Sequence, residues 1–151
     1  MIAESRANLL EAQVEALVNA VNTVGVMGRG LALQFKLAFP GNFEEYQKAC
    51  KRKDVKLGEM FVTKVQGAGP VRAIINFPTK SHFRYNSRLE DIRSGLQDLV
   101  HVVRKESIGS IAIPALGCGL GHLRWEDVKP EIVGAFEELP DVQAILFPSQ
   151  E

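Results

Sequence analysis

The sequence predicts a three-layer α/β/α domain with a mixed, largely parallel central sheet. Short apolar or β-branched runs alternate along the chain with longer segments of helical period. Several of the short runs are apolar almost throughout, as is typical of strands that are covered on both faces. Alternating strands and helices favour a parallel sheet between helical layers, and such sheets bind ligands at the carboxyl ends of their strands.

The predicted strands are the short apolar runs Ala16–Val18, Met60–Val65, Arg72–Phe77, Ile111–Pro114 and Val142–Phe147. One helix follows Gly30 and ends at Phe39, because Pro40 and Gly41 come next. A second runs from Phe43 to about Arg52, and a last from about Glu126 to Leu139. The clearest helix has apolar residues three and four positions apart, at Leu89, Ile92, Leu96, Leu99 and Val103.

The composition indicates one soluble globular domain over residues 1–151. Hydrophobic residues make up 46% of the chain and charged residues 24%, which excludes a disordered protein. No repeat, low-complexity tract or linker divides the chain. Lys and Arg total 18, as do Asp and Glu, so no overall charge points to nucleic acid or membranes. A nucleic-acid substrate would have to be held by local basic residues.

The cysteines and the hydropathy pattern favour a cytoplasmic location. Cys50 and Cys118 lie far apart in unrelated contexts and form no zinc-binding set, so no metal is expected. A reducing compartment suits such thiols. No apolar run is long enough to cross a bilayer, and the N-terminus lacks the apolar core of a signal peptide. We therefore expect no membrane partner.

Two glycine-rich loops each follow a predicted strand and precede a predicted helix. The first runs from Asn19 to Ala32 and the second from Pro114 to His122, with three glycines in each. Glycine lets the backbone approach a phosphate, and a helix start offers unpaired N–H groups. One such loop could be a simple tight turn, but two at the same edge of a sheet predict a clamp for a diphosphate.

The two loops lack the signs of phosphoryl transfer. The spacing of Gly25, Gly28 and Gly30 differs from the G-x-G-x-x-G of dinucleotide-binding folds, and no Gly-Lys-Ser/Thr sequence follows. Neither loop has a carboxylate that could hold magnesium. The clamp therefore suits a diphosphate that is held intact, without a metal or another cofactor.

These segments resemble the ADP-ribose-binding loops of the macrodomain family. The resemblance rests on Asn19 to Asn22, on Met27 to Ala32 and on Pro114 to Leu120, and it extends over essentially the whole chain. Within the family, Asn22 to Lys36 and Phe77 to Lys80 are most similar to the branch of terminal ADP-ribose protein glycohydrolase and the DarG-type antitoxins. The antitoxins of this branch remove ADP-ribose that a partner toxin has placed on thymidine in single-stranded DNA.

The resemblance implies roles for individual residues. Lys80, in the loop after the strand that ends at Phe77, matches the catalytic lysine of the branch. Asn8 and Leu9 match positions that meet the adenine, and Asn19 and Asn22 match positions near the distal ribose. The residues expected to bind ADP-ribose are Asn8, Leu9, Asn19, Ala20, Val21, Asn22, Thr23, Gly28, Arg29, Gly30, Leu31, Ala32, Gly117, Cys118, Gly119, Leu120 and Gly121.

A lysine suits the chemistry that the resemblance implies. Release of ADP-ribose breaks a glycosidic bond at the anomeric carbon, which carries positive charge in the transition state. Lys80 could attack that carbon and form a Schiff base, or act as an acid or base at the leaving group. Attack requires a neutral amine, so burial or a nearby cation would have to lower its pKa from about 10.4. Without the resemblance, Lys80 would be taken for a solvated loop residue.

The chain departs from the protein-directed enzymes of the branch at one position. Those enzymes have an Asp directly after the Gly-Cys-Gly-Leu segment, where it assists the lysine, and here that residue is Gly121. A mechanism that needs both groups does not carry over, which favours the DNA-directed members. His122 could serve as an acid or base, although a solvent-facing loop histidine is the simpler interpretation.

Basic and aromatic residues follow Lys80 directly. Arginines can pair with phosphates and rings can stack on bases, so the candidate DNA contacts are His82, Arg84, Tyr85 and Arg88. A charged loop with the rings of Phe83 and Tyr85 in the core explains the pattern equally well.

Two other residues invite a functional interpretation but are better explained by packing. Cys118 could be a nucleophile, yet a small residue that fits a crowded loop is the better interpretation. Trp125, just after the second loop, is expected to anchor the start of a helix in the core and not to stack on a ligand.

The sequence therefore predicts a glycohydrolase that removes ADP-ribose from thymidine in single-stranded DNA, as the antitoxin to a DNA ADP-ribosyltransferase toxin. Two alternatives stay open. One is a module that binds ADP-ribose without cleaving it, and the other is an enzyme for protein-linked ADP-ribose or O-acetyl-ADP-ribose. We expect a monomer, and the chain could be one part of a longer antitoxin, because antitoxins of this type carry a further toxin-binding region.

Overall fold

The structure, a computed structural model, describes residues 1–148 and is built around one six-stranded sheet with the order β1-β6-β5-β2-β4-β3. All neighbouring strands are parallel except β3, which pairs antiparallel with β4. The predicted mixed, largely parallel sheet is therefore confirmed. Its strands are β1 (Ile2–Glu4), β2 (Ala16–Asn22), β3 (Phe61–Lys64), β4 (Ala73–Lys80), β5 (Ser110–Pro114) and β6 (Gln143–Phe147).

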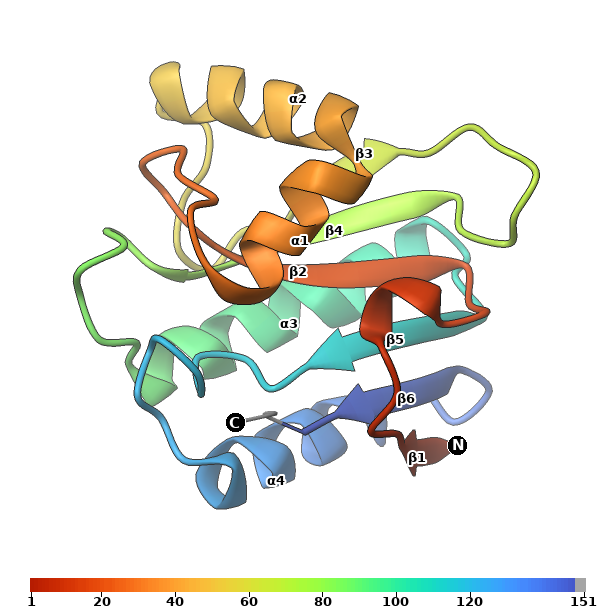
Figure 1. Ribbon diagram of the computed structural model, residues 1–151. Helices are drawn as coiled ribbons and strands as arrows, with labels where there is room; N and C mark the ends of the chain where they lie inside the picture. Colours follow the sequence, from red (N-terminus) through yellow and green to blue (C-terminus); the bar gives the residue numbers. More distant parts are fainter. Residues whose placement is uncertain (149–151) are drawn as a thin grey trace.

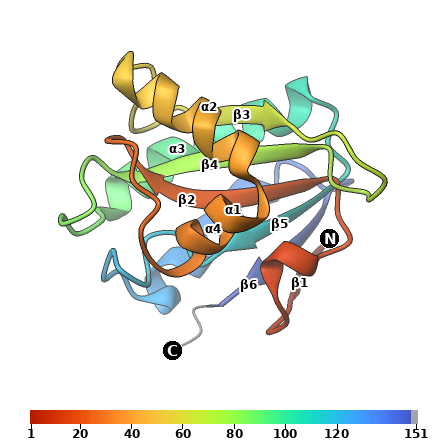
Figure 2. The same ribbon diagram turned by 45° about the horizontal axis from the view of Figure 1, so that its top comes forward.

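Helices cover both faces of the sheet, which confirms the three layers. The α1 and α2 helices lie on one face, and α3 and α4 on the other (Figures 1 and 2). No helix within residues 1–148 is long and apolar enough to cross a membrane. The helices are η1 (a short 3-10 helix, Leu9–Glu11), α1 (Gly30–Ala38), α2 (Pro40–Lys51), α3 (Leu89–Lys105) and α4 (Trp125–Phe136).

Alternate residues of the central strands enter the core on opposite faces of the sheet. In β2, Ala16 and Val18 pack with residues of α3 and α4, whereas Leu17 packs with residues of η1 and α1. This alternation follows from the period of two in a strand. Gly95 of α3 lies so close to the ring of Phe77 that an added Cβ would come within 2.4 Å of it. The glycine therefore allows α3 to pack closely on the sheet.

The predicted ends of two central strands, the start of α2 and the end of α4 were wrong; α4 ends at Phe136, three residues before the predicted Leu139. The β2 and β4 strands pair from Ala16 and Ala73 as far as Asn22 and Lys80, with a register shift at the last step. The hydrogen bonds of this parallel ladder hold segments that local sequence alone assigned to loops. Lys80 is consequently the last residue of a strand and not a loop residue. The α2 helix begins at Pro40, three residues early, because Pro is well accepted in the first turn of a helix.

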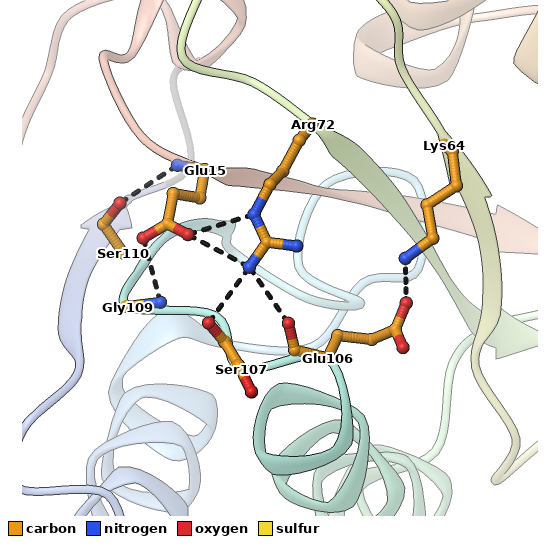
Figure 3. Close-up of polar contacts among 7 residues, drawn as sticks. All are labelled: Glu15, Lys64, Arg72, Glu106, Ser107, Gly109 and Ser110. Carbon is orange, nitrogen blue, oxygen red and sulfur yellow. Dashed lines mark hydrogen bonds and ion pairs between the residues drawn. The ribbon is translucent and has the colours of Figure 1, made fainter.

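Charged side chains connect the loops at the amino ends of the strands (Figure 3). The guanidinium of Arg72 binds the carboxylate of Glu15 at 3.1 Å and donates to the carbonyl oxygens of Glu106 and Ser107 at 2.9 and 3.0 Å. The same carboxylate accepts a hydrogen bond from the backbone N–H of Gly109 at 3.1 Å. These residues precede β2, β4 and β5, so this Arg72 network joins the starts of three strands.

Candidate functional site

A cleft of about 1210 Å³ lies at the opposite edge of the sheet, where the strands have their carboxyl ends. Three loops meet there: residues 23–29 after β2, 81–88 after β4 and 115–124 after β5 (Figure 1). The volume is comparable with the largest small-molecule sites, which reach about 1,000 Å³. The predicted residues that line the cleft are Asn8, Leu9, Ala20, Val21, Asn22, Gly28, Arg29, Gly30, Leu31, Ala32, Lys80, Arg84, Gly117, Cys118, Gly119, Leu120 and Gly121.

The glycines of the second loop are of two kinds. An added Cβ at Gly121 would lie 2.3 Å from Ser87 Oγ and 2.5 Å from the carbonyl oxygen of Gly117. Gly117 has a φ of +73°, and its added Cβ would lie 2.8 Å from Leu123. The loop itself therefore requires glycine at both positions. Gly119 differs, because an added Cβ there would meet no atom within 4 Å. Its lack of a side chain leaves open space in the cleft.

The charges that line the cleft are all positive. Arg6, Arg29, Lys80 and Arg84 line it, and no Asp or Glu of the described residues 1–148 does so. The start of α1 adds to this field, because Gly28 to Ala32 all line the cleft and Arg29 forms no side-chain cap on the first N–H groups of the helix. The site is thus suited to an anionic ligand.

Asn22 shapes the first loop through hydrogen bonds that the sequence did not reveal. Its Nδ2 donates to the carbonyl oxygen of Val26 at 2.8 Å, and its Oδ1 accepts from the backbone N–H of Val24 at 3.1 Å. The hydroxyl of Tyr46, on α2, donates to the same Oδ1 at 2.9 Å. Burial raises the pKa of Tyr46 well above its usual range, so the hydroxyl keeps its proton. No local pattern in the sequence connects Tyr46 with this loop.

Asn19 and Thr23, both expected to bind ligand, lie outside the lining of the cleft. Asn19 is fully buried, where its Nδ2 donates to Met27 Sδ at 3.7 Å, and its Oδ1 has no hydrogen-bond partner within residues 1–148. Thr23 donates to the carbonyl oxygen of Ser81 at 2.9 Å and so connects the first loop with the loop after β4. Both residues support the walls of the cleft.

Lys80 reaches across the cleft from the end of β4 to the second glycine-rich loop. Its Nζ donates to the carbonyl oxygen of Leu120 at 3.1 Å. Partial burial lowers the pKa of Lys80 below its ordinary value of 10.5. The pairing of β2 with β4 therefore places a lysine that loses its proton more readily between the two glycine-rich loops.

The family follows from a match to the Macro domain over residues 18–132, which include both glycine-rich loops and Lys80. The chain belongs to the macrodomain family. The predicted family is thus confirmed by its sequence, and the predicted fold is confirmed by its similarity to solved macrodomains.

This macrodomain is 51% identical to the DNA ADP-ribosyl glycohydrolase of Mycobacterium tuberculosis over 98% of its own length, and it spans 42% of that relative. It is similar to the solved macrodomain of M. tuberculosis DarG, with a TM-score of 0.98, 51% identity and 99% of both chains covered. Thermosipho africanus DarTG in complex with ADP-ribose gives a TM-score of 0.92 and 34% identity, with 99% of this chain and 42% of that chain covered.

The packing around Gly121 explains why this macrodomain has no Asp there. Ser87 is buried against the second loop, and its backbone N–H donates to the carbonyl oxygen of Gly121 at 2.9 Å. Any side chain at position 121 would meet both Ser87 and the backbone of Gly117. The loop would have to change its course to accommodate a carboxylate.

The structure supports the structural interpretations of Cys118 and Trp125. Burial, together with a smaller contribution from the charge of Asp127, raises the pKa of Cys118 to about 11, so the reactive thiolate is disfavoured. Trp125 is half-buried and packs against the part of the core that lies between the sheet and the α3 and α4 helices. His122 is exposed at the rim of the cleft, in the left-handed backbone region with a φ of 65°.

One interpretation of the loop after β4 is wrong. Phe83 and Tyr85 keep 43% and 59% of their surface exposed, so their rings do not lie in the core. Both rings pack against His82 within the loop itself instead of against the sheet. Of the candidate DNA contacts in this loop, only Arg84 lines the cleft; His82, Tyr85 and Arg88 lie outside its lining.

Sequence reasoning missed several residues that line the cleft, including Arg6, Gln34, Thr79, Phe147 and Pro148. Phe147 ends β6 and Pro148 follows it, so the strand pattern of the sequence could have predicted their position at the carboxyl edge of the sheet. No group of three or more His, Cys, Asp or Glu within residues 1–148 is arranged to hold a metal ion.

Proposed function

We propose that this macrodomain is a glycohydrolase that binds ADP-ribose in the cleft and releases it from ADP-ribosylated thymidine in single-stranded DNA. The observation that carries the proposal is the position of Lys80, a lysine of lowered pKa, in a cationic cleft between two glycine-rich loops. The activity named for the M. tuberculosis relative supports the choice of DNA. The closed packing at Gly121 also supports it, because the carboxylate of the protein-directed enzymes has no room there.

The cleft offers complementary chemistry for each part of ADP-ribose. Leu9 and Asn8 provide an apolar and an amide surface for the adenine at one end. The diphosphate fits between the N–H groups at the start of α1 and the open space at Gly119, where no side chain intervenes. The distal ribose then lies towards Lys80 and Leu120. Asn19 and Thr23 do not contact the ligand but support the loops that line the cleft.

Hydrolysis at this site requires only water as a second reactant. The hydroxyl of water ends on the anomeric carbon, and the thymine leaves with the electron pair of the glycosidic bond and gains a proton. Lys80 can displace thymine from the anomeric carbon as a neutral amine; the C1–O4 bond of the ribose then breaks, its oxygen takes a proton, and a Schiff base forms. Water hydrolyses this Schiff base, which releases ADP-ribose and restores the amine. Lys80 can instead transfer the proton at the leaving group. In the first role the release rate rises with pH towards the lowered pKa of Lys80.

The test compares wild type with Lys80→Ala on ADP-ribosylated thymidine oligonucleotide and on ADP-ribosylated protein. We expect wild type to act on the oligonucleotide, and the variant to lose at least about a hundredfold in release rate, in the range of one catalytic group. ADP-ribose binding by calorimetry should remain within a few fold of wild type. Lys51→Ala, at the exposed end of α2, is the matched control. Borohydride trapping of a covalent adduct would distinguish the two roles of Lys80.

Three outcomes would contradict the proposal. If wild type and Lys80→Ala are equally inactive on every adduct, the domain is a binding module. If wild type acts on protein and not on DNA, the substrate class is wrong. If Lys80→Ala keeps full activity on DNA, another group reacts.

The cellular role follows the resemblance to DarG-type antitoxins. We infer that the domain works in the cytoplasm as a monomer and counteracts a DNA ADP-ribosyltransferase toxin. Co-expression with such a toxin should rescue growth for wild type but not for Lys80→Ala. Light scattering of the purified protein should give the mass of one chain, 16.6 kDa.

A further inference from the structure

The loop between β4 and α3 holds three aromatic rings in one cluster. His82 stacks on Phe83 with 4.2 Å between ring centroids and 28° between planes, and it lies 5.2 Å from Tyr85. The turn is held by its own backbone, because the N–H of Arg84 donates to His82 Nδ1 and the N–H of Tyr85 donates to the carbonyl oxygen of His82, each at 3.1 Å. The cluster is thus arranged before any ligand binds.

Much of this cluster is exposed to solvent, although the rings of Phe83 and Tyr85 are large and mainly apolar. Phe83 is 43% exposed and Tyr85 59% exposed. Aromatic rings usually bury most of their surface, so exposed rings in a fixed turn need another explanation than the core. Other exposed apolar side chains lie close to the same edge of the sheet, at Val24 and Val26 in the first loop and at Leu120 in the second.

The cluster adjoins the reacting end of the cleft. Lys80 directly precedes this turn, and Lys80, Phe83 and Arg84 all line the cleft. Tyr85 lies outside the lining, so the cluster extends from the mouth of the cleft onto the outer surface. A group attached to the sugar at Lys80 would leave the cleft in this direction.

The charge around the rings is positive. The guanidinium of Arg84 lies 5.7 Å from the centre of the Phe83 ring, and no carboxylate of residues 1–148 forms an ion pair with it. Arg88 pairs with the exposed Glu90. Flat rings beside a cation suit a strand with stacking bases and anionic phosphates, whereas an acidic peptide would leave the ring faces unused.

We propose that His82, Phe83 and Tyr85 form a stacking platform for an unmodified nucleobase next to the ADP-ribosylated nucleotide of a single strand. The proposal rests on the proposed function, since it extends the same site beyond the modified base. It predicts that the enzyme distinguishes an oligonucleotide from a single modified nucleoside, because only the oligonucleotide has a neighbouring base for the platform.

The test measures kcat/KM for an ADP-ribosylated thymidine oligonucleotide relative to that for ADP-ribosylated thymidine alone. We expect this ratio to fall about tenfold in the double variant Phe83→Ala/Tyr85→Ala, mainly through KM, as for the loss of one stacked base. Tyr85→Phe should keep the wild-type ratio because it keeps the ring. Leu37→Ala, which removes an exposed apolar side chain of α1, is the matched control. When the nucleotides beside the modified one are abasic, the oligonucleotide-to-nucleoside ratio of kcat/KM measured with wild type should fall to the value that the double variant gives.

A second measurement does not depend on catalysis. Fluorescence anisotropy of an unmodified labelled single-stranded oligonucleotide should show about tenfold weaker binding for the double variant than for wild type. An unchanged ratio, whether from no loss or from an equal loss on both substrates, would overturn the platform, and so would unchanged anisotropy. If wild type releases ADP-ribose from no DNA adduct, the proposed function fails, and the anisotropy measurement still decides whether the platform binds a single strand.

Discussion

The two edges of the sheet differ in how their charged side chains are paired. At the amino edge, Arg72 is satisfied by Glu15 and by two backbone carbonyl oxygens, so the charges there stabilise the fold. At the carboxyl edge, Arg29, Lys80 and Arg84 line the cleft, and no carboxylate of residues 1–148 forms an ion pair with these three side chains. The cations of the carboxyl edge are therefore available to an anionic ligand, whereas the charges of the amino edge are paired within the protein.

The largest expected effect is on ADP-ribose affinity and tests the cationic cleft at Gly119. Gly119→Glu should weaken ADP-ribose binding at least about a hundredfold, because it places a carboxylate where an anionic ligand fits. The melting temperature should change little, since an added Cβ at this position would meet no atom within 4 Å. Calorimetry and thermal unfolding check both parts. Gly134→Glu, at an equally open glycine of α4, is the control and should bind ADP-ribose normally; unchanged affinity in Gly119→Glu would refute the clamp.

The next effect concerns folding stability and is expected at Gly121, where the fold and not the ligand requires glycine. Gly121→Ala should lower the free energy of unfolding by about 3 kcal/mol, because its Cβ overlaps Ser87 and the backbone of Gly117. Gly119→Ala is the matched control and should cost little. Urea denaturation measures the difference. Equal stability of the two variants would show that the second loop yields readily and that packing does not exclude an Asp.

The smallest effect is expected at the amino edge of the sheet, where a substitution should lower stability without changing ligand binding. Arg72→Ala should lower the free energy of unfolding by about 2 kcal/mol, because Glu15 and two carbonyl oxygens lose their donor. ADP-ribose affinity and release should not change, since Arg72 lies at the edge away from the cleft. Arg93→Ala, which removes one exposed ion pair, should cost less than about 1 kcal/mol. A loss of affinity in Arg72→Ala would mean that the two edges are coupled.

The fold could be predicted from the sequence because helical apolar periods and short apolar runs alternate along it. The apolar period of Leu89 to Val103 predicted α3, and short apolar runs predicted the middle of every strand except β1. The ends of β2 and β4 were not readable, because Asn19 to Asn22 and Pro78 to Lys80 have no strand pattern of their own. Their pairing with each other makes them strands.

The sequence alone was enough to predict the edge of the sheet where the cleft lies and to suggest a chemical class for its ligand, because glycines after strands and before helices lead to one edge of a parallel sheet whatever the details of packing. Only the tertiary structure decided what each residue does there. Gly119 opens the cleft, whereas Gly121 accommodates Ser87. Asn22 is held by Tyr46, and Lys80 is held by Leu120 across 40 residues. Such contacts join residues that are distant in the chain, so no local pattern could specify them.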